Sequence, residues 1–270
     1  MENLTYIAAI STWWTGTVNI QYSLSYDAGK NQTTVIFAES NHAYYGRNGY
    51  GSSASTALTV TATDNTSSMA TATFATSGAT NGSTKTFTGT PSPVSVTVQH
   101  AAGAGEKAVT ISGETTIMVY PTSTATNMYT ATGSGSASVT SATAYILALT
   151  QGTGIAALTA EISSSSLRAA GTSVASGGMI YKSEEIKLKY TASPGYRNAA
   201  CMVSDIGAVA SGGTFSVIGN HTATATAIAM GGTVVVSGQK KTVAIYTRVG
   251  GQIKQLGVAT KIDGKVKMLT

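Results

Sequence analysis

Apolar and polar residues alternate with a period of two along much of the first half of the chain. Residues 18–26 place Val, Ile, Tyr, Leu and Tyr at every second position, with Asn, Gln and Ser between them. The alternation returns at residues 58–62, 70–74 and 94–98. Successive side chains of a strand point to opposite faces, so this pattern predicts strands with one buried face. Turn-forming residues at 27–31, 64–68 and 101–105 separate the strands, which predicts an N-terminal antiparallel β-sandwich.

A long uncharged stretch follows this region. Thr115–Ala160 spans 46 residues without a single Asp, Glu, Lys or Arg, and most of its side chains are small. Small residues on both faces indicate either closely packed strands or a surface that another chain covers. We assign residues 1–150 to the N-terminal β-sandwich domain with this extension, and we interpret Gln151–Gly154 as a linker.

Residues 151–230 read as a second β domain. Short alternating runs occur at 158–162, 186–190 and 222–227, and loop-like Ser- and Gly-rich segments separate them. A unit of this size with such spacing predicts a second, small Ig-like β-sandwich.

The last 40 residues, 231–270, contain an internal repeat. Gly238, Gly251 and Gly264 are 13 residues apart, and Lys241, Lys254 and Lys267 keep the same period. Each unit centres on Ser-Gly, Gly-Gly or Asp-Gly, dipeptides that suit two-residue hairpin turns because Gly tolerates positive φ. The repeat predicts a C-terminal ladder of short β-hairpins with Lys on its open face. Since two-stranded hairpins bury little by themselves, we expect them to pack on a partner or on copies of the chain.

Composition supports an all-β fold. Thr and Ser make up 75 of the 270 residues, whereas Leu occurs ten times and only 10% of residues are charged. The scarcity of Leu, Glu and Lys argues against a mostly helical protein, and 42% apolar content argues against disorder. The longest apolar run has six residues, which predicts no membrane span. Residues 1–10 have no basic start and no long apolar core, so we expect no signal peptide.

The net charge of +5 is unevenly distributed. Residues 1–237 hold nine Lys and Arg against ten Asp and Glu, whereas residues 238–270 hold seven against one. The whole excess therefore lies in the hairpin repeats, which argues against a uniformly basic nucleic-acid surface. The basic repeats either contact acidic polymers or form a solvated face, and we expect no specific nucleic-acid partner.

We find no arrangement of residues typical of catalysis. The single Cys201 and the distant His42, His100 and His221 predict no metal site and no cofactor. Glu184 and Glu185 are adjacent carboxylates, but neighbours on a strand face opposite sides, so a solvated strand is the alternative to an acid/base site. The chain is therefore not expected to be an enzyme.

Aromatic residues provide the better candidates for binding. The segment 42–51 is rich in Tyr, Gly and Asn, a composition that suits a contact loop in which rigid rings meet sugar rings. Alternatively, these rings fill the core or a subunit interface. The candidate binding residues are Tyr44, Tyr45, Arg47, Asn48 and Tyr50.

The chain resembles siphophage minor structural, receptor-binding proteins of the tail tip, which carry Ig-like β-sandwich modules. The resemblance rests on strand 94–98 followed by His100, Gly105, Lys107, Val109 and Ile111 in order, although Ala104 replaces the usual Asp. Features of the second domain, such as the Pro194–Tyr196 turn, and the C-terminal repeat also fit. In the repeat, however, Lys240, Ile253 and Val266 stand where those proteins have Trp.

The resemblance implies a virion component that attaches to the host surface and transfers no catalytic residues. It implies assembly in the bacterial cytoplasm and release by lysis. Its expected partners are copies of itself, with a trimer expected, other virion proteins and host cell-surface polysaccharide. Two alternatives remain open at this stage, a decoration protein of the capsid or tail tube, and a secreted bacterial adhesin or carbohydrate-binding module.

Overall fold

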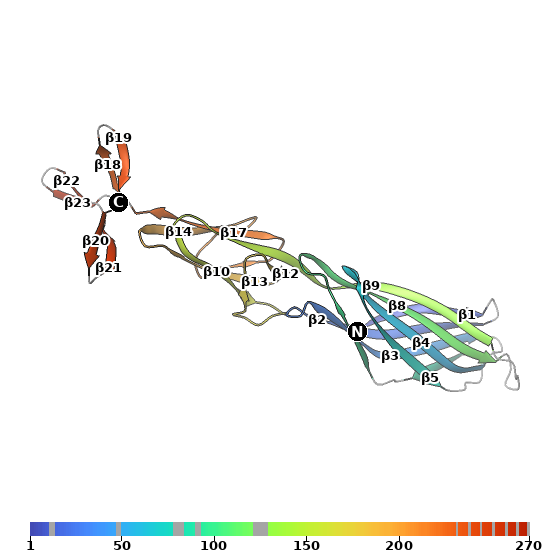
Figure 1. Cartoon of the computed structure of the whole chain (residues 1–270). Helices are drawn as coiled ribbons and strands as arrows, with labels where there is room; N and C mark the ends of the chain where they lie inside the picture. The colour runs from blue at the N-terminus through green and yellow to red at the C-terminus, as the bar shows by residue number, and fades with distance from the viewer. Residues whose placement is uncertain are drawn as a thin grey trace. The chain divides into compact units, whose positions relative to one another are not determined.

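The structure is a computed structural model whose regular elements are all strands in the part it describes (Figure 1). It describes residues 1–10, 14–46, 50–77, 84–89, 93–120 and 129–230, and the hairpin strands after residue 231. For residues 14, 39–46, 50–53, 74–77, 84–89, 120 and the hairpins, only the backbone is described. The chain divides into two compact units, Met1–Ala144 and Tyr145–Thr270. The predicted all-β fold is thus confirmed.

The first unit contains eight strands and the first part of a ninth. They are β1 (Glu2–Ile10), β2 (Trp14–Asp27), β3 (Gln32–Gly46), β4 (Tyr50–Ala62), β5 (Asn65–Ser77), β6 (Thr84–Gly89), β7 (Val94–Gln99), β8 (Gly105–Tyr120) and β9 (Tyr129–Gln151). The turn expected at 64–68 is shorter than predicted, because β5 already begins at Asn65.

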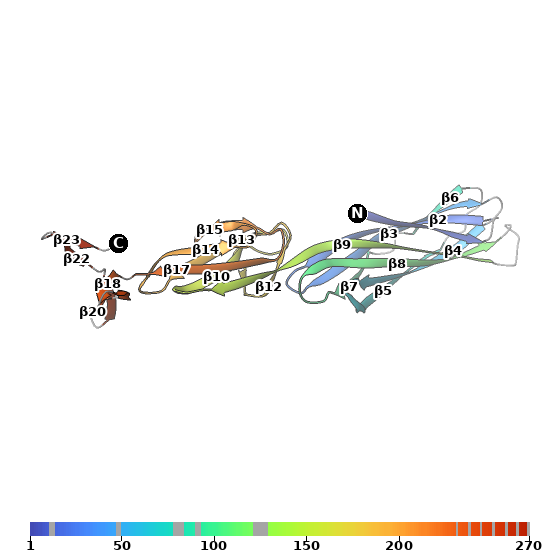
Figure 2. The same cartoon turned by 90° about the horizontal axis from the view of Figure 1, so that it is seen from above.

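Two antiparallel layers make up this first unit. One layer runs β1–β2–β3, with β6 and β7 pairing with different halves of β3. The other runs β5–β4–β8–β9, and β8 and β9 lie side by side over 15 paired positions (Figure 2). A single pair, Ala9 with Thr132, joins the layers along one edge, so the sheet is nearly closed.

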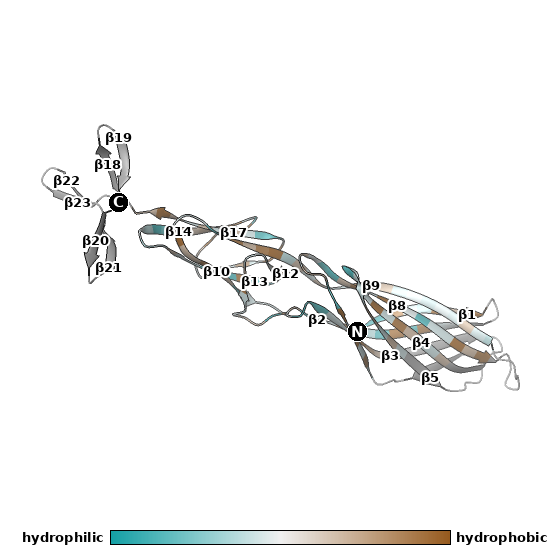
Figure 3. Ribbon diagram, viewed as in Figure 1, coloured by the Kyte–Doolittle hydropathy of each residue, from teal (hydrophilic) through white to brown (hydrophobic). Residues whose placement is uncertain are grey.

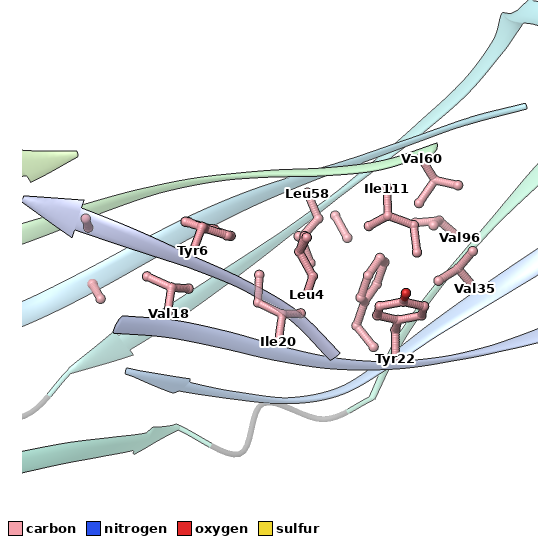
Figure 4. Close-up of a cluster of buried hydrophobic side chains, with 14 of the residues drawn as sticks. Leu4, Tyr6, Val18, Ile20, Tyr22, Val35, Leu58, Val60, Val96 and Ile111 are labelled. Carbon is pink, nitrogen blue, oxygen red and sulfur yellow. The ribbon is translucent and has the colours of Figure 1, made fainter. Parts of the chain in front are cut away.

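The core of the first unit lies between these layers. Hydrophobic positions alternate with polar ones along its strands, as the sequence pattern predicts (Figure 3). The buried side chains point toward one another from both layers (Figure 4). Labelled members of this cluster are Leu4, Tyr6, Val18, Ile20, Tyr22, Val35, Leu58, Val60, Val96 and Ile111.

Glycines on β8 and β9 let Tyr6 of β1 pack closely against the opposite layer. A Cβ at Gly135 would lie 2.7 Å from the Tyr6 ring, and one at Gly133 would lie 2.1 Å from the main-chain oxygen of Ile7. The Tyr6 hydroxyl lies 2.6 Å from Oγ1 of Thr115, which satisfies both buried groups. Of the two explanations for the uncharged stretch, close strand packing therefore applies to the inner face of β9.

The second unit is a two-layer β-sandwich. One layer is β11–β10–β13–β16; the other contains β15–β14–β17 and the last residues of β9, with which β12 also pairs. Its strands are β10 (Ile155–Ser164), β11 (Ser173–Val174), β12 (Gly178–Tyr181), β13 (Glu185–Ala192), β14 (Tyr196–Val203), β15 (Gly207–Val209), β16 (Thr214–Ser216) and β17 (His221–Ala229).

The end of β9 belongs to this second unit. Residues 147–151 pair in parallel with 221–225 of β17, and the Gly152 amide donates a hydrogen bond of 2.8 Å to the Ala225 carbonyl. Gln151–Gly154, interpreted above as a linker, therefore lies inside the second unit, and the boundary between the units falls at residues 144–145. A run of small residues hides this boundary in the sequence.

Three hairpins follow, as the repeat predicts. They are β18–β19 (Gly232–Val236 and Gln239–Val243), β20–β21 (Ile245–Val249 and Gln252–Leu256) and β22–β23 (Ala259–Ile262 and Lys265–Met268). Each pair forms a separate two-stranded sheet rather than one continuous ladder. None of the residues that the structure describes form a helix long and apolar enough to cross a membrane.

Candidate functional site

Three of the five predicted contact residues lie near strand ends. Tyr44 and Tyr45 belong to β3, where they pair with Lys85 and Thr84 of β6, and Tyr50 is the first residue of β4. The tyrosines thus occupy the ends of two strands rather than a free loop. Arg47 and Asn48 lie outside the described residues, so a joint contact site stays a prediction.

Three charged or ionisable side chains converge in the first unit, which we call the Asp64 network. Asp64 lies in the turn between β4 and β5, His100 follows β7, and Lys107 is the third residue of β8. His100 Nδ1 lies 2.7 Å from one carboxylate oxygen of Asp64, and Lys107 Nζ lies 3.0 Å from the other. The His100 and Lys107 side chains are 0% and 1% exposed, whereas that of Asp64 is 22% exposed.

The network continues from His100 into the sheet. His100 Nε2 lies 2.8 Å from Oγ1 of Thr33, which lies 2.7 Å from Oγ of Ser141. Ser141 donates its hydroxyl proton to the Lys107 carbonyl at 2.5 Å. Each hydroxyl has one proton, so Thr33 donates to Ser141 and accepts from His100. The two ring nitrogens of His100 thus face Asp64 on one side and Thr33 on the other.

A hydrolytic triad also connects a carboxylate, an imidazole and a hydroxyl, but the group to which the hydroxyl donates its proton differs from that in the Asp64 network. In a triad the imidazole accepts the hydroxyl proton and so activates the nucleophile. In the bonding order above, Thr33 gives its proton to Ser141, and its side chain is fully buried. The arrangement therefore links strands and turns of the first unit to one another.

Asn31 ties the β2–β3 turn to the same network. It adopts φ of 55°, a left-handed conformation that Asn tolerates well, and its amide donates to the carbonyls of His100 and Ala101 at 3.0 and 2.9 Å. The hydroxyl of Tyr26 donates to the Asn31 side-chain oxygen at 2.7 Å. Lys107 Nζ also donates to the Ala101 carbonyl at 2.7 Å. The turn after β2 and the turn after β7 are thereby fixed to each other and to β8.

The ionisation of Asp64 depends on these partners. Burial alone raises the pKa of Asp64, but hydrogen bonds and charge attraction from His100 and Lys107 outweigh this effect and lower it below 3.8. The carboxylate is therefore the form that the folded unit favours.

Acid should weaken the first unit through Asp64. Because the folded-state pKa lies below the unfolded value, the contribution of the carboxylate is complete above pH 3.8 and is lost as pH falls through the folded pKa. We expect Asp64→Asn to be less stable than the wild type at pH 7 and the difference to shrink below pH 4. Urea unfolding at several pH values measures this, and a difference that does not change with pH would contradict it.

A second buried ion pair lies in the second unit. Glu184 is 1% exposed and accepts hydrogen bonds from Arg168 at both carboxylate oxygens, from Ser165 at 2.8 Å and from the Tyr181 amide at 2.8 Å. The Arg168 guanidinium also lies 5.0 Å from the centre of the Tyr181 ring. The solvated-strand interpretation is therefore wrong for Glu184, which closes the β12–β13 turn.

A shallow groove of about 510 Å³ lies on the outer face of β4, β8 and β9. Apart from Glu114, its lining side chains are small, because the inward-facing positions opposite Tyr6 are glycines and the outward positions are Ser, Thr or Ala. The lining residues are Ala57, Thr59, Ser112, Gly113, Glu114, Ser134, Gly135 and Ser136. Such a groove offers hydroxyl groups and one carboxylate for polar contacts. Among the described residues, no three His, Cys, Asp or Glu side chains gather in a way that would hold a metal ion.

Comparisons with known proteins identify no relative. No family model matches the chain, and neither the curated proteins nor the solved structures gave a significant match.

Sequence reasoning identified two members of the Asp64 network, His100 and Lys107, as motif residues, but it missed Asp64. The signal was weak, because Asp64 stands in a polar turn where Asp is common for other reasons. Its neighbours in the fold are 36 and 43 residues away along the chain.

Proposed function

We propose that this chain is a structural component of a bacteriophage virion, a tail-tip or fibre protein that contributes to host-surface attachment. One observation carries the proposal. His100 and Lys107, which carry the resemblance to tail-tip proteins, meet on one carboxylate inside the first unit. Gly105 of the same motif adopts φ of 134°, a conformation that favours glycine. The motif residues therefore belong to one local structure, as expected if the motif has the same structural role in both proteins.

The order of the modules also supports the proposal. A nearly closed β-unit, a small β-sandwich and three hairpins follow one another along the chain, in the order that the resemblance implies. All the hairpins close with two-residue turns, at Val236–Gln239, Val249–Gln252 and Ile262–Lys265, which again differ by 13 residues.

Mass spectrometry of purified phage particles tests the proposal. Peptides from both units should remain with particles through density-gradient purification and a high-salt wash. Recovery of the chain only from the medium of uninfected bacteria would contradict a virion role and favour a secreted adhesin or carbohydrate-binding module. Recovery with tail-free heads or along the tail tube would favour a decoration protein.

Tyr44 and Tyr50 are the proposed contacts with host polysaccharide. The double change Tyr44→Ala with Tyr50→Ala should lower binding to host cells by tenfold or more, about 1.4 kcal/mol, because each ring offers a flat apolar face to a sugar. Cell-binding titration measures this, with circular dichroism as the folding control. Wild-type binding by a folded double variant would remove these residues from the contact site.

We also propose that the chain assembles into a homo-oligomer, with a trimer expected. Strand β9 carries no charged residue and exposes small side chains along its outer face, and further copies of the chain would cover this face. Light scattering of the purified protein should give about three times the 27.3 kDa of one chain. A stable monomer at micromolar concentration would contradict the proposal.

A further inference from the structure

The net excess of positive charge in this protein lies in the hairpins. Residues 238–270 carry seven Lys and Arg and one Asp, whereas the preceding 237 residues carry a slight negative excess. A charge excess gathered on a few short strands produces a local field that the chain average does not reveal. The function of that field is not explained by the fold of either unit.

The register places a lysine at the same position in every hairpin. Counting paired positions outward from the turn, the third pair joins Val234 to Lys241, Thr247 to Lys254 and Thr260 to Lys267. The repeat in sequence is thus a repeat in strand position. Three equivalent lysines follow one another at the same distance from each turn.

The second pair from each turn carries another cation. There Lys240 is paired with Val235, Arg248 with Ile253 and Lys261 with Val266. The cation changes strand between hairpins, but its distance from the turn is constant. Successive pairs occupy opposite faces of a two-stranded sheet, so every hairpin has at least one cationic position on each face. The third hairpin has a further cation, Lys265, in its first pair.

Cations on both faces oppose burial of either face against an apolar surface. Taking an unpaired charge out of water is costly, and a surface that carries the opposite charge removes that cost. We propose that the three hairpins form a binding site for a linear polyanion of the bacterial surface, a polymer with a phosphodiester or carboxylate group in each repeating unit. The inference rests on the proposed function and names the ligand class of its attachment step.

The composition of the repeats favours such a polymer over nucleic acid. Proteins that bind single-stranded nucleic acid combine basic residues with aromatic rings on which bases stack. Residues 231–270 contain one aromatic residue, Tyr246. Three equivalent sites on one chain suit a polymer with repeating charges, because each bound unit raises the local concentration of the next.

Titration of the full-length protein with purified poly(glycerol phosphate) tests the inference. The change Lys241→Gln, Lys254→Gln and Lys267→Gln should weaken binding at least tenfold at 0.15 M salt and reduce the salt dependence, because fewer counterions are released. The variant with Arg at the same three positions should keep the affinity. This result would show that binding depends on charge at these positions and that the hairpins still form.

A charge-matched control uses lysines outside the hairpins. Lys30, Lys182 and Lys187, all changed to Gln, remove the same net charge, and the first two are well exposed. This variant should bind within about twofold of the wild type. The inference would be overturned if both Gln variants weakened binding equally, or if the hairpin Gln variant bound like the wild type. It would also be overturned if the Arg variant failed to bind, or if the protein bound single-stranded DNA more tightly. Because the assay uses purified components, its failure leaves the virion proposal to its own test.

Discussion

Replacing Asp64 with alanine is expected to reduce the free energy of unfolding of the first unit by about 3–5 kcal/mol. The substitution removes the carboxylate that both His100 and Lys107 bond, and it leaves the Lys107 ammonium 1% exposed without its counter-ion. Losing one partner of a buried pair costs far more than losing an exposed pair. Urea unfolding of wild type and variant at pH 7 measures the difference.

A double variant separates charge from packing in this network. Asp64→Ala combined with Lys107→Met removes both charges and keeps an apolar chain in the buried position, so it should be more stable than Asp64→Ala alone. Lys30→Ala, which breaks the exposed pair with Asp27, is the matched control and should change stability little. If Asp64→Ala resembled Lys30→Ala, the Asp64 network would not stabilise the first unit.

The second large effect is expected at Gly133. In Gly133→Val the new Cβ would lie 2.1 Å from the Ile7 carbonyl oxygen and 2.6 Å from the Cα of Ala8, both of them backbone atoms of β1. The two layers would have to separate, so we expect a loss near the upper end of the usual range for overpacking, about 3 kcal/mol. Thermal and urea unfolding provide the measurement.

The neighbouring residue supplies the control. Ser134 lies next along β9 and is exposed on the outer face, so Ser134→Val adds the same branched side chain where there is space. It should leave stability nearly unchanged, because valine suits an exposed strand. Equal losses at both positions would contradict close packing of the layers around Gly133.

Local pattern was sufficient to predict most strands. The alternation at residues 18–26 predicts β2 because one face of that strand is buried, and Val18 and Ile20 are indeed fully buried. The 13-residue repeat predicts the hairpins because a two-residue turn fixes the pairing on both sides of it. Both features leave a local mark on the sequence, a period of two in β2 and a turn dipeptide in each hairpin.

Features that depend on distant partners escaped sequence reasoning. The sequence shows Glu184 beside Glu185 on what reads as a solvated strand, but Arg168 of an earlier loop binds Glu184 and buries it. The boundary at residues 144–145 was missed because β9 continues through it and pairs with β8 on one side and β17 on the other. Parallel pairing of β9 with β17 joins residues more than 70 positions apart, and no local pattern marks it.

The candidate binding residues also include some that the sequence locates in the fold and some that it does not. Tyr44, Tyr45 and Tyr50 were identified by composition, which finds residue types but not their place at the ends of β3 and β4. The lysines of the hairpins were identified by periodicity, and the register adds that each hairpin has a cation in two successive pairs. The sequence therefore predicts where a charge lies along a strand better than it predicts the surroundings of an aromatic ring.

Immunogold electron microscopy of intact virions tests the central proposal most directly. Antibody raised against residues 145–230, the β-sandwich part of the second unit, should place gold at the tail tip or fibres of most particles. Particles from a phage that lacks this chain should remain unlabelled. Gold on the capsid or along the tail tube would contradict a tail-tip or fibre protein. Intact particles without any gold would also contradict it, provided that the antibody binds the purified chain.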